Sequence, residues 1–203
     1  MVVMDDPDSI LKCTNKVYLA ELLRNNRVPT PETVIVSKET LGEVEKRIAY
    51  PIVLKIPDGS FSRGVFKVGD HAELQTTSRR LFKESDLILA QEFLFTEFDW
   101  RIGVLDKQPI FACKYFMSKR HWQIVNHSAR GRSASFGDHV TFAVEDAPAD
   151  VIRLAQRAAR MMGNGLYGVD IKQTAQGLKV IEVNDNPSIE SRVEDKVLGN
   201  ELY

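Results

Sequence analysis

One stretch near the end of the chain, residues 166–184, constrains the fold more than any other. It reads LYGVDIKQTAQGLKVIEVN, in which two runs rich in apolar and β-branched residues flank Ala175–Gly177. A connection this short joins two strands only as an antiparallel hairpin, and its glycine suits the left-handed position of a three-residue loop. We therefore expect an antiparallel sheet that contains this hairpin.

The register of the hairpin places acidic residues opposite each other. A three-residue loop pairs Thr174 with Leu178 and brings Asp170 opposite Glu182, and Asn184 shares the face of Glu182 because residues i and i+2 point the same way. Opposed carboxylates have Cβ atoms about 5 Å apart and repel unless a cation lies between them. Two interpretations stay open. One is a solvent-exposed polar face without an ion, and the other is a Mg²⁺ site completed by phosphate oxygens and water.

The rest of the chain mixes helix and strand signals, and short turns often join adjacent strands. Helical periodicity covers residues 14–26, 41–48, 70–85 and 147–163. Strand signals cover residues 33–36, 50–56, 65–68, 86–94 and 99–117, the last with a turn at 106–109. Residues 118–138 are polar without a sustained period, which predicts a long loop or a broken hairpin. This order favours an α+β fold over a doubly wound parallel sheet.

Composition excludes several classes of partner. The 203 residues are 43% hydrophobic and 27% charged, enough for one core or two small lobes that share a cleft. A formal net charge of −1 gives no basic field for nucleic acid or an anionic membrane. No apolar run approaches the ~20 residues that span a bilayer, and the first residues lack the features of a signal peptide. The widely spaced Cys13 and Cys113 fit a reducing, cytoplasmic location.

Lys55 stands out because it lies inside an apolar strand segment, PIVLKI, where a lysine is rarely buried without a partner. The loop Asp58–Gly64 follows directly, and its glycines and serines allow backbone N–H groups to approach an anion. The chain has neither a GxxxxGK[ST] nor a GxGxxG motif. A phosphate clamp and a lysine that snorkels at a strand end both remain possible.

Two further segments carry polar groups at strand ends. Asp99 and Arg101 share a strand face, as either a surface ion pair of little energetic weight or part of a site. Residues 88–94, ILAQEFL, run from a strand into polar residues and could either offer backbone groups to an adenine edge or simply end the strand.

Taken in order, these stretches resemble the ATP-grasp superfamily, and within it the RimK-type ATP-dependent carboxylate–amine ligases. The resemblance runs from about residue 15 to about residue 190 and rests on NKVYLAELL, PIVLKIPDGSFSRGV, LILAQEFL, FDWRIGVL, YGVDIK and VIEVNDNPSIE. It implies an α+β ATP-grasp fold in which two lobes with antiparallel sheets hold ATP between them. Residues 1–14 would then be a remnant of, or linker from, a missing N-terminal domain, residues 15–90 the phosphate-loop lobe, and residues 91–203 the metal-binding lobe.

The resemblance also assigns roles to individual residues. Arg101 and Lys55 would act on the phosphates during catalysis, and Asp99 would hold the ribose. The metal ligands would be Asp170, Glu182 and Asn184, with Mg²⁺ as the ion and Mn²⁺ able to substitute. The remaining nucleotide-binding positions that it implies are Lys16, Asp58, Gly59, Ser60, Gly64, Gln91, Glu92, Phe93, Leu94, Asn126 and Arg130.

The implied activity is an ADP-forming ligation through an acyl phosphate, joining an amino acid to an amino acid, a peptide or a protein. ATP and this acceptor would be the partners, without nucleic acid or membrane, and a homo-oligomer is left open. Two alternatives are an ATP-grasp module that binds nucleotide without ligase activity and a phosphotransferase. Product analysis separates the ligase from the phosphotransferase, because a ligase releases free phosphate and a kinase does not.

Overall fold

The computed structural model describes residues 6–58, 64–119, 121–126 and 135–202. The chain divides into two compact units. The small unit spans Thr14–Leu94, and the large unit combines Met1–Cys13 with Phe95–Tyr203. The domain division expected from the sequence differs from this one, since it ended the first lobe at residue 90 and treated residues 1–14 as a linker.

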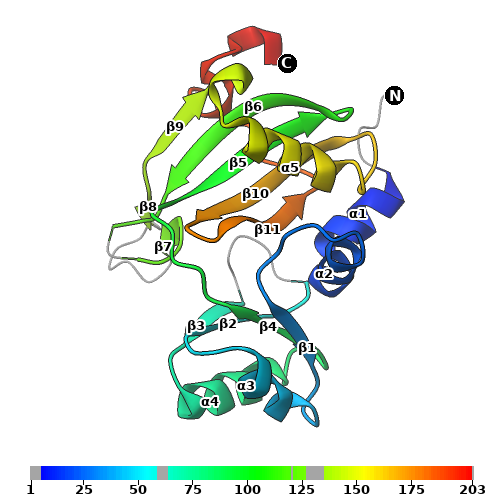
Figure 1. Ribbon diagram of the computed structural model, residues 1–203, viewed down its shortest axis with the longest axis vertical. Helices are drawn as coiled ribbons and strands as arrows, with labels where there is room; N and C mark the ends of the chain where they lie inside the picture. The colour runs from blue at the N-terminus through cyan, green and yellow to red at the C-terminus, as the bar shows by residue number, and fades with distance from the viewer. Residues whose placement is uncertain (1–5, 59–63, 120, 127–134, 203) are drawn as a thin grey trace. The chain divides into compact units, whose positions relative to one another are not determined.

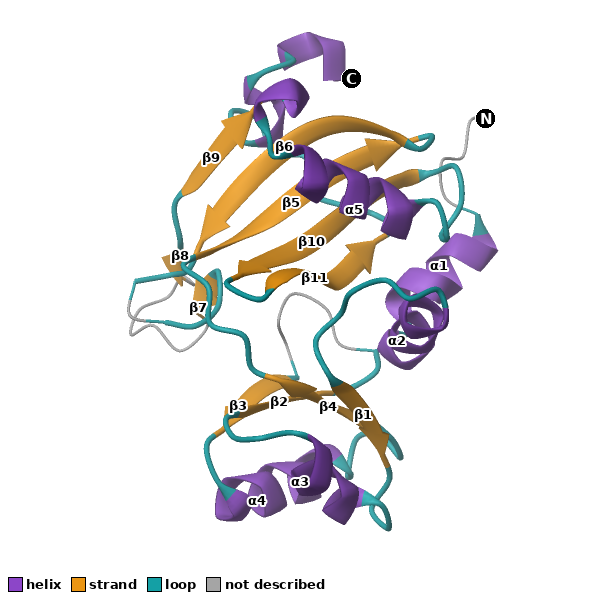
Figure 2. Cartoon of the chain, viewed as in Figure 1, coloured by secondary structure: helices purple, strands orange, loops and turns teal. Residues whose placement is uncertain are grey.

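The small unit is built on a four-stranded antiparallel sheet with strand order β1-β4-β2-β3. Its strands are β1 (Thr33–Val36), β2 (Ile52–Lys55), β3 (Val65–Val68) and β4 (Ile88–Glu92). Its helices are α2 (Lys16–Asn25), the 3₁₀ turn η1 (Leu41–Glu43), α3 (Val44–Arg47) and α4 (His71–Leu81). Figure 2 shows α3 and α4 on the same face of this sheet.

Side-chain caps begin two of these helices. The Asn15 side chain accepts a hydrogen bond from the Tyr18 backbone N–H at the start of α2, over 3.0 Å. The Asp70 side chain accepts one from the Glu73 N–H at the start of α4, over 2.9 Å. Each cap satisfies a backbone donor that has no partner within its helix.

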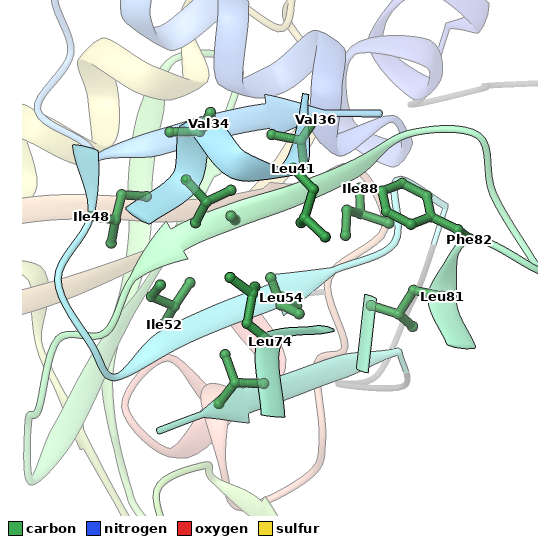
Figure 3. Close-up of a cluster of buried hydrophobic side chains, with 13 residues drawn as sticks. Val34, Val36, Leu41, Ile48, Ile52, Leu54, Leu74, Leu81, Phe82 and Ile88 are labelled. Atoms are coloured by element: carbon green, nitrogen blue, oxygen red, sulfur yellow. The ribbon is translucent and has the colours of Figure 1, made fainter. Parts of the chain in front are cut away.

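The core of the small unit lies between its sheet and the helices α3 and α4, as the close-up in Figure 3 shows. Alternate strand positions supply one half of the core and the apolar faces of the helices supply the other. The buried side chains include Val36, Val44, Ile52, Leu54, Leu74, Leu81 and Ile88, none more than 1% exposed.

The large unit is built on a five-stranded antiparallel sheet with strand order β11-β10-β5-β6-β9. Its strands are β5 (Phe98–Leu105), β6 (Gln108–Phe116), β9 (His139–Phe142), β10 (Leu166–Thr174) and β11 (Gly177–Asn184). Helix α5 (Ala149–Ala159) packs on one face of this sheet and runs across β10, β11 and β5 (Figure 1). The apolar alternate residues of the strands, such as Ile102 and Val169, are fully buried. This arrangement leaves the opposite face of the sheet to polar side chains.

Shorter elements complete the large unit. They are α1 (Pro7–Thr14), the strands β7 (Val125–Asn126) and β8 (Ser135–Phe136), and the 3₁₀ helices η2 (Val144–Asp146), η3 (Glu194–Lys196) and η4 (Gly199–Leu202). Strands β7 and β8 pair with each other, so the polar segment 118–138 contains the broken hairpin that its sequence allowed. None of the helices in the described ranges has the length and apolar character needed to cross a bilayer.

The antiparallel pairing in both units confirms the predicted α+β class. The sequence analysis did not anticipate strand β9 or helix α1.

Candidate functional site

The polar face of the large sheet carries a patch of charged side chains contributed by three neighbouring strands. The pairing of β10 with β5 sets Asp170 opposite Arg101 and Lys172 opposite Asp99. The pairing of β10 with β11 sets Asp170 opposite Glu182. Positive and negative groups therefore alternate along β5, along β10 and across the β5–β10 pair, whereas β11 places a second carboxylate beside Asp170.

The predicted pairing of Asp170 with Glu182 is confirmed, but the predicted turn is wrong. Thr174 pairs with Gly177 and not with Leu178, so the connection is a two-residue turn. Gly177 has φ of +119°, a backbone conformation that residues other than glycine rarely adopt. A β-bulge then shifts the register, because Ile171 pairs with Val180 while Asp170 pairs with Glu182, which leaves Ile181 as the extra residue. The bulge restores the pairing that the sequence analysis had derived from a different loop.

Asp170 and Arg101 form a bidentate ion pair at the centre of the patch. Arg101 Nε donates to Asp170 Oδ1 over 2.7 Å, and Arg101 Nη2 donates to Oδ2 over 2.8 Å. The two side chains are only 23% and 16% exposed, so the pair is largely shielded from water. The Asp170 carboxylate raises the pKa of the Arg101 guanidinium above its ordinary value, and the Glu182 carboxylate adds to this effect. The pair holds the guanidinium in a fixed orientation.

A second buried ion pair lies beside the first one. Lys172 Nζ donates to Asp99 Oδ1 over 2.6 Å and to Thr96 Oγ1 over 2.8 Å, and Thr96 also donates to Asp99 Oδ1. The Lys172 and Asp99 side chains are 14% and 15% exposed. Burial raises the pKa of the Asp99 carboxyl, while the charge and hydrogen bond of Lys172 oppose that change. Asp99 and Arg101 thus each pair across strands and not with each other.

Lys172 was not predicted as a site residue, although it lies within a predicted strand and follows the apolar Ile171. A lysine in a strand needs a partner when it is buried, and this argument had been applied to Lys55 alone. Its partner could not be inferred from local sequence, because Asp99 lies 73 positions away.

The three residues expected to hold a metal ion provide donors that suit Mg²⁺. Asn184 Nδ2 donates to the Gly168 carbonyl over 3.2 Å and to Asp170 Oδ2 over 3.3 Å, which leaves the amide oxygen as the group able to bind a cation. Together with the carboxylates of Asp170 and Glu182 it forms an all-oxygen donor set, as a hard cation requires. No group of three His, Cys, Asp or Glu side chains suited to a metal occurs in the described residues, so this set depends on an amide as its third ligand.

In the small unit, Lys55 is held by a hydrogen-bond chain across the sheet. Lys55 Nζ donates to Gln91 Oε1 over 2.8 Å, and Gln91 Nε2 donates to Thr33 Oγ1 over 3.0 Å. The hydroxyl of Thr33 in turn donates to the Pro31 carbonyl. Gln91, expected from the sequence to contact the nucleotide, therefore orients Lys55 with one end of its amide.

The residue before the Asp58–Gly64 loop contacts the start of α2. The Lys16 backbone N–H donates to the Pro57 carbonyl over 3.2 Å, and Asp58 is exposed. Gly64 has φ of +72°, and a Cβ built there would lie 2.6 Å from Ile56 Cγ1, so this position requires glycine. Gly59 and Ser60 lie outside the described residues.

The end of β4 and the residues that follow it make several side-chain contacts within the small unit. The Glu92 carboxylate accepts a hydrogen bond from the Glu32 N–H over 3.1 Å, and Lys67 Nζ lies 4.7 Å from the centre of the Phe93 ring. Leu94 is half-buried. These contacts fix the segment expected to line an adenine pocket.

The remaining expected positions fall in the polar segment between β6 and β9. Asn126 lies in β7, where its backbone pairs with that of Ser135. Arg130 lies outside the described residues.

A family model and several known proteins match this chain. The model of the RimK-like ATP-grasp domain matches residues 13–200. The α-aminoadipate–LysW ligase LysX of Sulfolobus acidocaldarius is 30% identical over 201 residues, which cover 94% of this chain and 68% of that protein. The tetrahydromethanopterin:α-L-glutamate ligase of Methanocaldococcus jannaschii is 29% identical over 195 residues, covering 92% of this chain and 62% of that protein. The chain thus spans about two thirds of the length of these relatives.

A solved structure shares the fold. The D-alanine–D-alanine ligase of Bacillus anthracis superposes with a TM-score of 0.74 at 16% sequence identity, over 96% of this chain and 65% of that one. The family match extends over nearly the whole sequence, and the sheets of both units lie within it. The chain belongs to the RimK-like ATP-grasp family.

Proposed function

We propose that this chain forms the ATP-binding part of an ATP-dependent, ADP-forming carboxylate–amine ligase that joins an amino acid to an amino acid, a peptide or a protein. The observation that carries the proposal is the patch of Asp170, Arg101, Glu182 and Asn184, in which an arginine and three oxygen donors meet on one sheet face. The relatives named above are ligases that act on amino acids or on LysW by their names.

The proposed reaction has two steps. A carboxylate oxygen of the acid substrate attacks the γ-phosphorus of ATP, the bond to the β,γ-bridging oxygen breaks, and ADP leaves. The amine nitrogen then attacks the acyl carbon, phosphate leaves with the acyl-oxygen bond electrons, and the amine loses a proton. Phosphoryl transfer needs positioning and charge neutralisation more than covalent help from the protein, and no nucleophilic side chain is required.

Each named side chain has a role that fits its contacts. Arg101 binds phosphoryl oxygens, or the acyl phosphate, with a guanidinium that Asp170 already orients. Lys55 binds a phosphate with the ammonium that Gln91 holds in place. Asp99 retains Oδ2 for a ribose hydroxyl, since Lys172 and Thr96 both use Oδ1.

Asp170, Glu182 and Asn184 would hold Mg²⁺, or Mn²⁺ in its place. The bound ion would supply neutralisation of charge on the phosphate oxygens. Among proteins of the same fold, a D-alanine–D-alanine ligase has been solved with ATP and the ligase PsnB with Mg and ADP. Those structures support the choice of nucleotide and cation.

The test is calorimetric titration of ATP into this chain with and without MgCl₂, repeated with Glu182→Ala. We expect wild-type binding to require Mg²⁺ and the variant to lose that requirement together with most of the affinity. Glu145→Ala is the matched control, because Glu145 is an exposed carboxylate of the same unit. Absence of ATP binding by the wild-type chain both with and without MgCl₂ would refute the proposal for this chain.

Product analysis then separates the ligase from its alternatives. ADP and free phosphate that appear only when an amino acid and an amine are both present indicate ligation. ADP without free phosphate indicates a phosphotransferase, and binding without turnover indicates a nucleotide-binding module.

A further inference from the structure

The segment that follows β11 crosses the polar face of the large sheet. Pro187 lies against Gly168 so closely that a Cβ on Gly168 would be 2.7 Å from Pro187 Cβ. Further along, the Val193 carbonyl accepts a hydrogen bond from Thr141 Oγ1 over 2.6 Å, on β9 at the other edge of the sheet. We call residues 185–196 the C-terminal strap. It spans the sheet from β10 to β9 and passes the strands that carry the charged patch.

Glu194 of the strap is a buried carboxylate. It is only 2% exposed, and an ionised carboxylate in such a place is costly unless hydrogen bonds hold it. Its Oε1 accepts a hydrogen bond from the Tyr115 hydroxyl, and its Oε2 accepts one from the Glu190 backbone N–H over 2.8 Å. One carboxylate oxygen therefore ties the strap to β6, and the other holds the backbone within the strap.

Tyr115 connects this buried carboxylate to the charged patch. The Arg101 guanidinium carbon lies 5.5 Å from the centre of the Tyr115 ring, within the range of a cation–π contact. Burial and the hydrogen bond to Glu194 raise the pKa of the Tyr115 phenol, so the hydroxyl stays a donor near neutral pH. One continuous set of contacts thus runs from Glu194 through Tyr115 and Arg101 to Asp170.

We propose that Glu194 and Tyr115 are positioning residues that hold the Arg101 guanidinium in place for its role on phosphoryl oxygens. The inference deepens the proposed function and rests on it for that role. Arg101 has the Asp170 carboxylate on its guanidinium edge and the Tyr115 ring near the guanidinium carbon. The Tyr115 hydroxyl donates to Glu194, and the side chain also has Cys113 and the His139 ring as neighbours. Without the Glu194 anchor the ring is held less firmly beside the guanidinium.

A simpler role for Glu194 would be to staple the strap to the sheet, with no effect on Arg101. Thr141→Val provides the control, because it removes the neighbouring hydrogen bond between strap and sheet, together with a 3.6 Å contact to Cys113 Sγ, and leaves the side chains of Tyr115 and Arg101 unchanged. Tyr115→Phe removes the hydroxyl and keeps the ring. Glu194→Gln keeps the shape and an acceptor oxygen, whereas Glu194→Ala removes both.

The measurement is solvent exchange of the Arg101 Nε–H by ¹⁵N NMR on the intact chain, with the signal assigned from Arg101→Lys. This readout needs no nucleotide. We expect Tyr115→Phe and Glu194→Ala to speed the exchange by about tenfold, as loss of a charge-assisted hydrogen bond would. Glu194→Gln should restore part of the protection, and Thr141→Val should leave it unchanged.

Titration of ATP with MgCl₂ into the same variants completes the experiment. Tyr115→Phe should weaken binding by several-fold relative to Thr141→Val. Faster exchange in a chain whose wild type binds no ATP would refute the proposed function and leave the positioning role intact. Unchanged exchange in both Tyr115→Phe and Glu194→Ala, or an equal effect of Thr141→Val, would overturn the inference.

Discussion

Replacing Lys172 by methionine tests whether the second ion pair of the patch is as buried as the structure shows. The change keeps most of the side-chain volume and removes the cation, so the Asp99 carboxylate stays in a site only 15% exposed. At the observed N–O distance of 2.6 Å, an effective dielectric constant of about 20 gives a direct attraction of roughly 6 kcal/mol. This attraction is a gross upper bound, because the unfolded chain regains hydration of both charges.

The net expectation lies between that of an exposed pair and that of a fully buried one. Exposed pairs contribute up to about 1 kcal/mol, and removing one partner of a buried pair costs about 3–5 kcal/mol. Since both side chains retain some exposure, we expect Lys172→Met to lower the free energy of unfolding by about 2–4 kcal/mol. Asp99→Asn should cost less, because the flexible stem of Lys172 lets its ammonium reach water. The double variant should be less destabilised than the sum of the two.

Urea unfolding followed by tryptophan fluorescence measures this change in the stability of the large unit. Both tryptophans, Trp100 and Trp122, belong to the large unit, and Trp100 is 2% exposed. Asp8→Asn is the control, because it breaks the 2.5 Å ion pair between Asp8 and Lys12, in which the Asp8 side chain is 68% exposed. That variant should change the free energy of unfolding by less than about 1 kcal/mol. A shift for Lys172→Met no larger than the control, or strict additivity in the cycle, would refute the reasoning.

Two other changes have defined outcomes. Gly103→Ala should destabilise the large unit by about 1–3 kcal/mol, because the new Cβ would lie 2.2 Å from Phe111 Cε1 in the packed sheet; urea unfolding measures the loss, and Phe111→Leu should restore part of it. In the small unit, hydrogen bonds from Tyr50 and then His71 lower the pKa of the Glu45 carboxyl below 4.5. A carboxyl whose pKa is lowered on folding stabilises the fold at pH values above its ordinary pKa. That contribution is lost as the pH falls through the folded-state pKa. The deficit of Glu45→Gln, measured by circular dichroism during urea unfolding, should therefore be present at pH 7 and shrink below about pH 4.5; a deficit independent of pH would contradict it.

Local sequence rules predicted much of the fold because the signals are local. Strand β3 and strand β1 have the bounds that their apolar runs predict, and Asn15 and Asp70 cap their helices as short polar side chains do. Strand β9 escaped notice because four residues of mixed polarity carry little periodic signal. Its place in the sheet comes from pairing with β6, which no local pattern reveals.

The charged patch was predictable only in part for the same reason. Asp170, Glu182 and Asn184 lie on one hairpin, and the sequence predicts the Asp170–Glu182 pairing, although the turn and the bulge that produce it were not predicted. The partnership of Asp170 with Arg101 depends on the β5–β10 register, and that of Tyr115 with Glu194 on the path of the strap. Glu194 also sits in a run of charged residues that resembles a solvated surface, so nothing in the sequence indicated its burial.

The bulge at Ile181 changes which alternate residues of β11 face the charged patch. From the turn to Val180, counting by twos from Gly177 assigns faces in one way, and beyond Ile181 the assignment is reversed. If Ile181 instead took a regular place in the ladder, it would pair with Asp170, and Glu182 and Asn184 would turn toward the face that α5 covers. Deleting Ile181 would leave a regular ladder in which Glu182 follows Val180 and still pairs with Asp170. The extra residue thus compensates for the two-residue turn, and in comparisons between related chains a gap at this position is compatible with an intact patch.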